Sequence, residues 1–251
     1  MPRFFADAEN ITSDTVILTG DDAHHLSRSL RMAAGEQITV CDGKGTDLLC
    51  ELSAFLPDRV EARILERTPS KTEPPYRAML YQALPKGDKF DSIIQKAVEC
   101  GVWSITPFES ERCVVRLREE DQVKKTARRN RIALEAAKQC GRGIVPRVEN
   151  GVSFREALQQ ASTADLALFC YEGEKTRSLA SVLQSAPVLA GEKDAPVISV
   201  VIGSEGGFSE AEAKEAVDAG MIPVGLGPRI LRTETASSFV LACLSFAIEQ
   251  R

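Results

Sequence analysis

The sequence contains few of the residues that build metal centres, disulfide frameworks or membrane spans. Its only two histidines are neighbours, His24 and His25, so a histidine-rich metal site is not expected. The seven cysteines are scattered, odd in number and never arranged as C-x-x-C, which is typical of reduced thiols. No apolar run approaches the roughly 18–20 residues of a membrane span, and the N-terminus has no apolar run of signal-peptide length. These absences predict a cytoplasmic protein with no resident metal and no membrane segment.

The chain has the length and composition of a globular protein with a sizeable core. Its 251 residues, 43% hydrophobic and 27% charged, allow one large domain or two small ones. The net charge of −5 does not by itself indicate a polyanionic partner. Between residues 112 and 147, however, eleven Lys and Arg residues stand against four acidic ones. This basic stripe indicates a surface for a polyanion, although a solvated helix face would have the same composition.

Two different patterns divide the chain. Residues 1–67 contain apolar or alternating runs of strand length, and the Asp-Gly-Lys-Gly sequence at 42–45 is typical of a β-hairpin turn. Residues 68–75 are polar and proline-rich, which favours a linker. From Tyr76 onward, short apolar runs alternate with helical patterns. That alternation predicts an α/β domain with a mostly parallel sheet covered by helices.

A glycine-rich loop follows the strand-like run PVISVVIG. This run is apolar on both faces, as a central parallel strand should be, and it leads into GSEGG at residues 203–207. Ser209 and Glu212 then form a capping-box pattern that predicts a helix beginning at Ser209. The glycines therefore occupy a strand-to-helix turn at the carboxyl edge of the sheet, where open α/β sheets bind ligands. Their spacing fits neither G-x-G-x-x-G nor a P-loop, and a simple tight turn remains an alternative.

Two further strands end in comparable loops. MIPVGLGPRILRTETASS again leads from an apolar strand through glycines into a helix, which we expect Thr233 or Thr235 to cap. LFCYEGEKTRS leaves a third strand through Tyr171 and Glu172. Because each of three strands ends in glycine and a charged group, the pattern favours one shared ligand site over three unrelated turns.

The combination of GSEGGFS and LGPRILRTETA resembles the SPOUT superfamily of RNA methyltransferases. More closely, the chain is similar to the RsmE family, which methylates N3 of a uridine in 16S ribosomal RNA. The motifs HHLSRSLRM, VCDGKG, LPKGDKFDSIIQKAVECGV, ESERCVV and ALEAAKQCGRGIVPRV extend the resemblance over essentially the whole chain. One departure is Ser204, where most members carry proline. The resemblance implies a PUA-like β-barrel, RNA-binding domain at 1–72 and a SPOUT α/β domain with a C-terminal trefoil knot at 73–251.

The resemblance also implies an S-adenosylmethionine site, because that cofactor binds bent among the three knotted loops in this family. Adenine is expected to meet backbone groups beside an apolar wall, and glycines allow the backbone to approach closely. The expected cofactor-binding residues are Tyr171, Glu172, Ile202, Gly203, Gly206, Gly207, Leu226, Gly227, Ile230, Leu231 and Thr233.

The chemistry implied by this family limits the choice of catalytic residues. Uridine N3 must lose its proton, or a cation must stabilise the anion that spreads over O2 and O4. No histidine occurs in the second domain, so arginine is more plausible than a histidine base, and Arg232 is the first candidate. Glu205 is the second, because it could accept from hydroxyls or shape the glycine loop. Two alternatives stay open: a salt bridge of Arg232 with Glu234 or Glu205, and an interaction of Glu205 with the helix dipole.

Contacts with RNA are expected from the basic residues. The pattern predicts a helix over about 121–140, with Lys124, Arg128 and Arg131 on one face. By type, these groups position phosphates and carry little sequence information. The expected RNA-binding residues are Arg31, Lys86, Lys89, Lys96, Arg128, Arg131, Gln139 and Arg142.

The last apolar segment, TASSFVLACLSFAIEQR, reads as a helix that is apolar nearly all round. Such a helix is buried on more than one side, and the resemblance favours a homodimer that uses it. The expected partners are therefore a second copy of the chain and 16S ribosomal RNA or the small ribosomal subunit. Rival interpretations are a ribose 2′-O-methyltransferase of the same superfamily, an RNA-binding protein with an inactive cofactor pocket, and a dinucleotide-dependent oxidoreductase.

Overall fold

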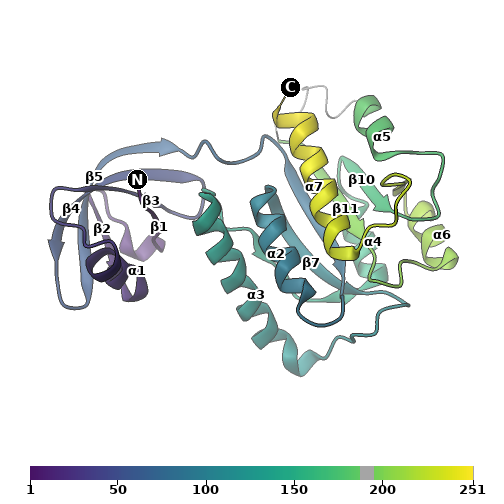
Figure 1. Ribbon diagram of the computed structural model, residues 1–251, viewed down its shortest axis with the longest axis horizontal. Helices are drawn as coiled ribbons and strands as arrows, with labels where there is room; N and C mark the ends of the chain where they lie inside the picture. Colours follow the sequence, from purple (N-terminus) through teal and green to yellow (C-terminus); the bar gives the residue numbers. More distant parts are fainter. Residues whose placement is uncertain (187–194, 251) are drawn as a thin grey trace. The chain divides into compact units, whose positions relative to one another are not determined.

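The computed structural model describes residues 1–186 and 195–250 (Figure 1). Contacts within the chain define two compact units. The first contains Met1–Glu73 and Ala137–Val145, and the second contains Pro74–Ala136 and Pro146–Arg251. Each unit is described by itself.

The first unit is built on a five-stranded sheet with the order β1-β3-β4-β5-β2. Its strands are β1 (Arg3–Phe5), β2 (Thr15–Thr19), β3 (Gln37–Cys41), β4 (Thr46–Phe55) and β5 (Arg59–Pro69). All neighbouring pairs are antiparallel except β1 with β3. Three short helical segments accompany them: η1 (Ala8–Asn10), α1 (Gly20–His24) and η2 (His25–Ser29).

Alternation along the strands explains how this sheet buries one face. In β4, Leu48, Cys50 and Leu52 are buried, as expected for side chains that point alternately to opposite faces. The predicted hairpin turn at 42–45 is confirmed, since β3 and β4 pair across it. The Asp42 carboxylate accepts the backbone N–H groups of Lys44 and Thr46, which closes the turn.

The predicted linker at 68–75 is confirmed for residues 70–75, which form no helix or strand, but is wrong for its first two residues. Strand β5 continues to Pro69, and the Glu73 carboxylate accepts hydrogen bonds from the backbone of Gly143 and Ile144. Arg142 donates to the same carboxylate from Nε and Nη2, at 3.0 and 2.7 Å. Proline and polar residues suggested a free connection, but one carboxylate anchors this segment to a part of the chain about seventy residues away.

The second unit is an α/β domain, as predicted, with a parallel sheet of order β12-β10-β11-β6-β7-β8 and β9 paired to β7. Its strands are β6 (Arg77–Ala83), β7 (Val102–Glu109), β8 (Arg147–Val148), β9 (Val152–Ser153), β10 (Leu166–Cys170), β11 (Val197–Ile202) and β12 (Ile222–Val224). Its helices are α2 (Lys89–Glu99), α3 (Glu119–Cys140), α4 (Phe154–Ala161), α5 (Leu179–Ser185), α6 (Glu210–Asp218) and α7 (Thr233–Glu249). Helix α3 extends into the segment assigned to the first unit.

Two layers of helices cover this sheet. Helices α2 and α7 pack side by side and contact β7 and β6, respectively, while α4 packs against β6, β7 and β11 (Figure 1). The central strand β11 is buried almost throughout, which explains why it is apolar except for Ser199, whose hydroxyl donates to the Ala161 carbonyl. Helix α2 buries Phe90, Ile93 and Ile94, with Ala97 and Val98, at the spacing predicted from the sequence.

The topology reverses between β6 and β11. From β6 the chain continues to its neighbour β7, whereas from β11 it continues through α6 to β12 on the opposite side. In open α/β sheets, ligands bind outside the carboxyl ends of the strands at such a point. Here the carboxyl ends of β10, β11 and β12, three adjacent parallel strands, lie at one edge.

Candidate active site

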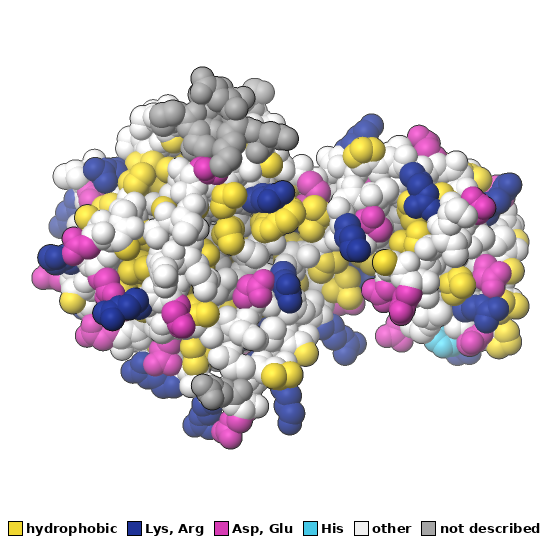
Figure 2. Space-filling view, turned by 180° about the vertical axis from the view of Figure 1, so that it is seen from behind, with side chains coloured by type: hydrophobic (Ala, Val, Ile, Leu, Met, Phe, Trp, Pro, Cys, Tyr) yellow, Lys and Arg dark blue, Asp and Glu magenta, His cyan; other side chains and the backbone are white. Residues whose placement is uncertain are grey.

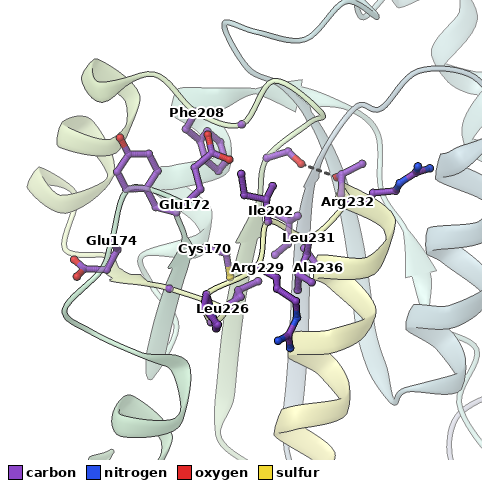
Figure 3. A pocket seen from close by; sticks show the side chains of 18 of the residues that line it. Cys170, Glu172, Glu174, Ile202, Phe208, Leu226, Arg229, Leu231, Arg232 and Ala236 are labelled. Carbon is purple, nitrogen blue, oxygen red and sulfur yellow. Dashed lines mark hydrogen bonds between the residues drawn. The ribbon is translucent and has the colours of Figure 1, made fainter.

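The three loops at this edge surround a cavity of about 930 Å³, which the first residues of α7 complete (Figure 3). A volume of this size is within the range of small-molecule and cofactor sites. Of the residues predicted to bind a cofactor, those that line it are Tyr171, Glu172, Ile202, Gly203, Gly207, Leu226, Gly227, Ile230, Leu231 and Thr233. Both catalytic candidates, Glu205 and Arg232, line it as well.

In the loop after β11, two positions need glycine because neighbouring atoms leave little or no room for a Cβ atom. Gly207 has φ of 63° and donates its N–H to the Ser204 carbonyl, which closes a tight turn. A Cβ atom built on Gly207 would lie 2.6 Å from Oε1 of Glu172. One built on Gly203 would lie 3.2 Å from both the Gly207 Cα and the Phe208 ring. The sequence pattern therefore reflects close packing of the loop on itself and on the β10 loop.

The structure separates Gly206 from the other predicted cofactor residues, since it does not line the cavity. A Cβ atom on Gly206 would lie 2.9 Å from the Cβ of Arg112, and Nη1 of Arg112 donates to the Gly206 carbonyl at 3.0 Å. The physical requirement at Gly206 is thus the approach of Arg112.

Gln82, on β6, is a site residue that the sequence reasoning missed. Its side chain is fully buried, and Nε2 donates to Thr233 Oγ1 at 2.9 Å and to the Gly203 carbonyl at 3.3 Å. Thr233 Oγ1 in turn donates to the same carbonyl at 2.6 Å. Gln82 therefore joins the glycine loop to the start of α7. The available signal was one amide residue inside the apolar run RAMLYQAL.

The expected cap of α7 by Thr233 or Thr235 is wrong. The N-cap position is Arg232, which makes no side-chain capping bond, and Thr233 is the first helical residue. The Thr233 hydroxyl does not cap the helix because it donates a hydrogen bond to the Gly203 carbonyl and accepts one from Gln82. By contrast, the predicted capping box at Ser209 and Glu212 is confirmed, with α6 beginning directly after Ser209.

Glu205 fastens the glycine loop to the segment after β6. Its Oε1 accepts from Nζ of Lys89 at 2.7 Å and from the backbone N–H of Lys86 at 3.1 Å. Partial burial alone would raise the pKa of the Glu205 carboxyl, but these hydrogen bonds and the Lys89 charge lower it below its ordinary value. The lowered pKa makes this carboxylate a weaker base, so Glu205 suits a positioning role better than proton abstraction.

A second carboxylate shapes the loop after β10. Glu174 accepts from the hydroxyl and backbone N–H of Thr176 and from the backbone N–H of Arg177. These hydrogen bonds lower the pKa of the Glu174 carboxyl to about 2. The same loop is joined to the exit of β12 by reciprocal backbone bonds, including Gly225 N–H to Arg177 O at 2.9 Å. Two of the three cavity loops are therefore one hydrogen-bonded unit.

Arg232 is exposed at the rim of the cavity, and in Figure 3 its guanidinium points away from Ile202 and Leu231. Within residues 1–186 and 195–250, no ion pair joins Arg232 to Glu234 or Glu205. The Glu205 carboxylate is instead taken by Lys89. Arg232 therefore has a charge that a ligand at the rim can reach.

The residues predicted to bind RNA differ in how accessible they are. Lys86, Lys96, Arg131 and Gln139 are exposed, and so is Arg31, whose φ of 53° is unusual for a residue with a side chain. Arg128 is exposed and ion-paired with Asp91, and Lys89 is paired with Glu205.

Arg142 has a different role from the one predicted. It is 4% exposed, and Glu73 binds its guanidinium in the first unit. A buried, paired guanidinium cannot reach a phosphate without breaking that pair, so we do not retain Arg142 among the RNA contacts.

Two further structural findings concern metals and membranes. In the described part of the chain, no group of three or more His, Cys, Asp and Glu side chains is placed to hold a metal ion. No helix among those residues is long and apolar enough to cross a bilayer.

Comparison with known proteins gives the class of this molecule. Residues 72–245 match the family described as RNA methyltransferase domain, and residues 18–65 match the RNA methyltransferase PUA domain. The chain is thus an RNA methyltransferase with an α/β domain and a PUA-like domain, as predicted. The trefoil knot stays a prediction.

Individual relatives narrow the class. Ribosomal RNA small subunit methyltransferase E of Bacillus subtilis is 37% identical over 94% of this chain and 91% of its own length. The protein of the same name from Synechocystis is 32% identical over 98% of this chain and 78% of its own. A crystal structure of the Neisseria gonorrhoeae protein of that name, bound to S-adenosyl methionine, aligns with a TM-score of 0.83 at 35% identity, covering 98% and 97% of the two chains. The chain belongs to the ribosomal RNA small subunit methyltransferase E family.

Proposed function

We propose that this protein transfers a methyl group from S-adenosylmethionine to N3 of a uridine in 16S ribosomal RNA. The observation that carries the proposal is the convergence of three strand-end loops on one cavity in a chain of this family. The cofactor is supported by the Neisseria relative, which is bound to S-adenosyl methionine. We place the reaction in the cytoplasm, on free RNA or on the small ribosomal subunit.

The residues of the cavity fit this cofactor. Ile202, Leu226 and Leu231 offer an apolar wall for a base, and the glycines beside them leave backbone groups accessible. Glu172 is exposed, lines the cavity and can accept from ribose hydroxyls. When bound, S-adenosylmethionine supplies an electrophilic methyl group.

Arg232 is the proposed catalytic residue. A guanidinium beside the uracil stabilises the anion left on O2 and O4 when the N3 proton passes to solvent. Glu205, proposed with it, acts by holding Lys89 and the glycine loop in place, because its carboxylate is already engaged.

RNA contacts are proposed for both units taken separately. In the first unit, exposed Arg31 and Gln139 are the candidates, and residues 1–72 form the proposed RNA-binding PUA-like domain. In the second unit, which lies within the methyltransferase domain proposed for 73–251, they are Lys86, Lys89, Lys96, Arg128 and Arg131. On the face drawn in Figure 2, Lys and Arg side chains alternate with Asp and Glu, which favours individual phosphate contacts over one broad basic surface.

A homodimer is proposed on the basis of helix α7. Phe239 and Phe246 on this helix are 40% and 70% exposed, and Ile230 just before it is 87% exposed. Large apolar side chains gathered around one helix are typical of a protein interface. A trefoil knot formed by the three cavity loops belongs to the same proposal.

The test is a methylation assay with labelled S-adenosylmethionine, offering 16S ribosomal RNA or small subunits from a strain that lacks this protein. Nuclease digestion and mass spectrometry should locate N3-methyluridine at one position. A ribose 2′-O-methyl product would instead favour the rival superfamily activity, and no product with either substrate would refute the proposal.

The role of Arg232 is tested by a matched pair of arginines at the cavity. Arg232→Lys should slow single-turnover transfer by about 10²–10³-fold, the range for one lost oxyanion donor. Arg229→Lys is the control, because Arg229 also lines the cavity and is exposed. Equal rates for the two variants would remove the catalytic role from Arg232.

A further inference from the structure

A second, smaller pocket lies in the α/β unit outside the proposed active site. It has a volume of about 190 Å³ and is formed by the segment after β6, the first turn of α2, the segment before α3 and the first half of α3. Its lining is strongly cationic. The positive residues are Arg116, Arg118, Lys125, Arg128 and Arg129, and the acidic ones are Asp88 and Asp91.

Some of these cations already have acidic partners. Arg116 pairs with Glu109, Lys125 with Asp121, and Arg128 with Asp91. These are exposed pairs, which contribute little and can reorganise when a stronger anion arrives.

Arg118 and Arg129 differ from the other three. No ion pair joins either of them to an acid within residues 1–186 and 195–250. The guanidinium of Arg129 lies 4.4 Å from the centre of the Phe90 ring. Burial lowers the pKa of Arg129 below its ordinary value, with Asp91 acting in the opposite direction. A partly desolvated guanidinium stacked on an aromatic ring still has its N–H donors to offer to an anion.

We propose that this pocket binds a phosphodiester group of the RNA substrate, with Arg118, Lys125 and Arg129 as its ligands. The proposal rests on the function proposed above. Guanidinium groups bind phosphate oxygens through parallel N–H donors, which suits Arg118 and Arg129. The volume is well below the roughly 300–1,000 Å³ of small-molecule sites, so the pocket fits one group of a longer polyanion better than a whole ligand.

The position of the pocket supports a role with the methylated strand. The segment 84–91 contributes to both sites, because Lys89 lines the large cavity while Asp88, Phe90 and Asp91 line the small pocket. Glu205 holds this segment through Lys86 and Lys89. An RNA strand that inserts a base into the cavity therefore has its backbone next to a segment that also borders the cationic pocket.

The experiment measures RNA binding by anisotropy over a range of salt concentrations, with 16S ribosomal RNA and a short oligouridylate as probes. Lys125→Gln and Arg129→Gln are the test variants. Lys214→Gln is the matched control, because Lys214 forms an i,i+4 pair with Asp218 just as Lys125 does with Asp121, but lies on α6. Titration with S-adenosylhomocysteine reports on the cofactor cavity in every variant.

We expect Arg129→Gln to weaken RNA binding about tenfold and Lys125→Gln about threefold. Each should lower the salt slope by about 0.7–0.9 for one lost phosphate contact. S-adenosylhomocysteine affinity should be unchanged in all variants, and Lys214→Gln should bind RNA like the wild type.

Two results would overturn the inference. One is RNA affinity and salt slope in Lys125→Gln and Arg129→Gln equal to those of Lys214→Gln. The other is that the wild-type protein binds inorganic phosphate and both variants lose this binding, while their RNA binding is unchanged. Either result leaves methylation by the wild-type protein intact, whereas failure of the proposed function would appear as absence of methyl transfer in the wild type itself.

Discussion

Replacing Gly207 with alanine tests the architecture of the cavity most directly. At φ of 63°, an L-residue other than glycine costs about 1–2 kcal/mol. The new Cβ would also lie 2.6 Å from Oε1 of Glu172, so the Glu172 side chain must move. Because that carboxylate is exposed, it can swing away at little cost to stability. The loss should therefore appear in ligand binding more than in folding.

The magnitude follows from what Glu172 contributes. A hydrogen bond to a charged group is worth about 1.5–3 kcal/mol, and every 1.4 kcal/mol is a factor of ten in affinity. If Glu172 accepts from ribose hydroxyls, Gly207→Ala should weaken S-adenosylhomocysteine binding by at least about tenfold in calorimetry. The melting temperature should fall by roughly 2–8 °C, at about 2–4 °C for each kcal/mol.

Gly206→Ala is the matched control. Gly206 does not line the cavity, and its added Cβ would meet Arg112 at 2.9 Å instead of Glu172. We expect a loss of stability with S-adenosylhomocysteine affinity within about threefold of the wild type. A folded Gly207→Ala protein with wild-type affinity would refute the reasoning, as would equal loss of affinity in both variants.

Four other predictions test individual contacts. Glu174→Gln should lower the melting temperature near neutral pH, and this difference should vanish as pH falls from about 4.5 towards 2, because a depressed pKa stabilises the fold only while the carboxyl is ionised. Gln82→Leu should reduce the free energy of unfolding in urea by about 1–3 kcal/mol, since it removes the donor to Gly203 and Thr233; an unchanged midpoint would contradict this. Phe246→Glu should convert a dimer to a monomer in light scattering, whereas Val217→Glu, on α6, should not. Arg142→Ala should reduce the free energy of unfolding by up to about 3–5 kcal/mol, because it leaves the partly buried Glu73 carboxylate with backbone N–H donors but without its guanidinium partner; an unchanged midpoint in urea would contradict this.

The features of the fold that could be predicted from the sequence are those set by residues close together in the chain. The capping box of Ser209 and Glu212 involves residues three apart, so its hydrogen bonds need no knowledge of the remaining chain. The mostly apolar run of β11 likewise indicates burial on both faces. The parallel sheet followed from alternating patterns, and placing the three glycine loops at one edge followed from the sheet.

Contacts between distant segments could not be predicted in the same way. Gln82 and Thr233 are 151 positions apart, and nothing in either local sequence specifies the other. The pairing of Glu73 with Arg142 could not be predicted either. Arginine is a residue type that often binds phosphate, but Arg142 is as buried as a core residue. In the sequence, a basic residue near glycines has the same pattern whether it binds phosphate or forms a structural ion pair, and only its partner in the fold distinguishes the two.

The carboxylates around the cavity show how such pairing assigns roles. Glu205 is held by Lys89 and by the backbone of Lys86, and Glu174 is held by Thr176 and Arg177 within its own loop. Within the described residues, no hydrogen bond or ion pair joins the Glu172 carboxylate to another side chain, although it lines the same cavity. Carboxylates that already have donors organise loops, and a carboxylate without one has its acceptor capacity left for a ligand. By this argument, Glu172 is the residue that should meet hydroxyl groups in the cavity, and Gly207 keeps the space in which it can do so.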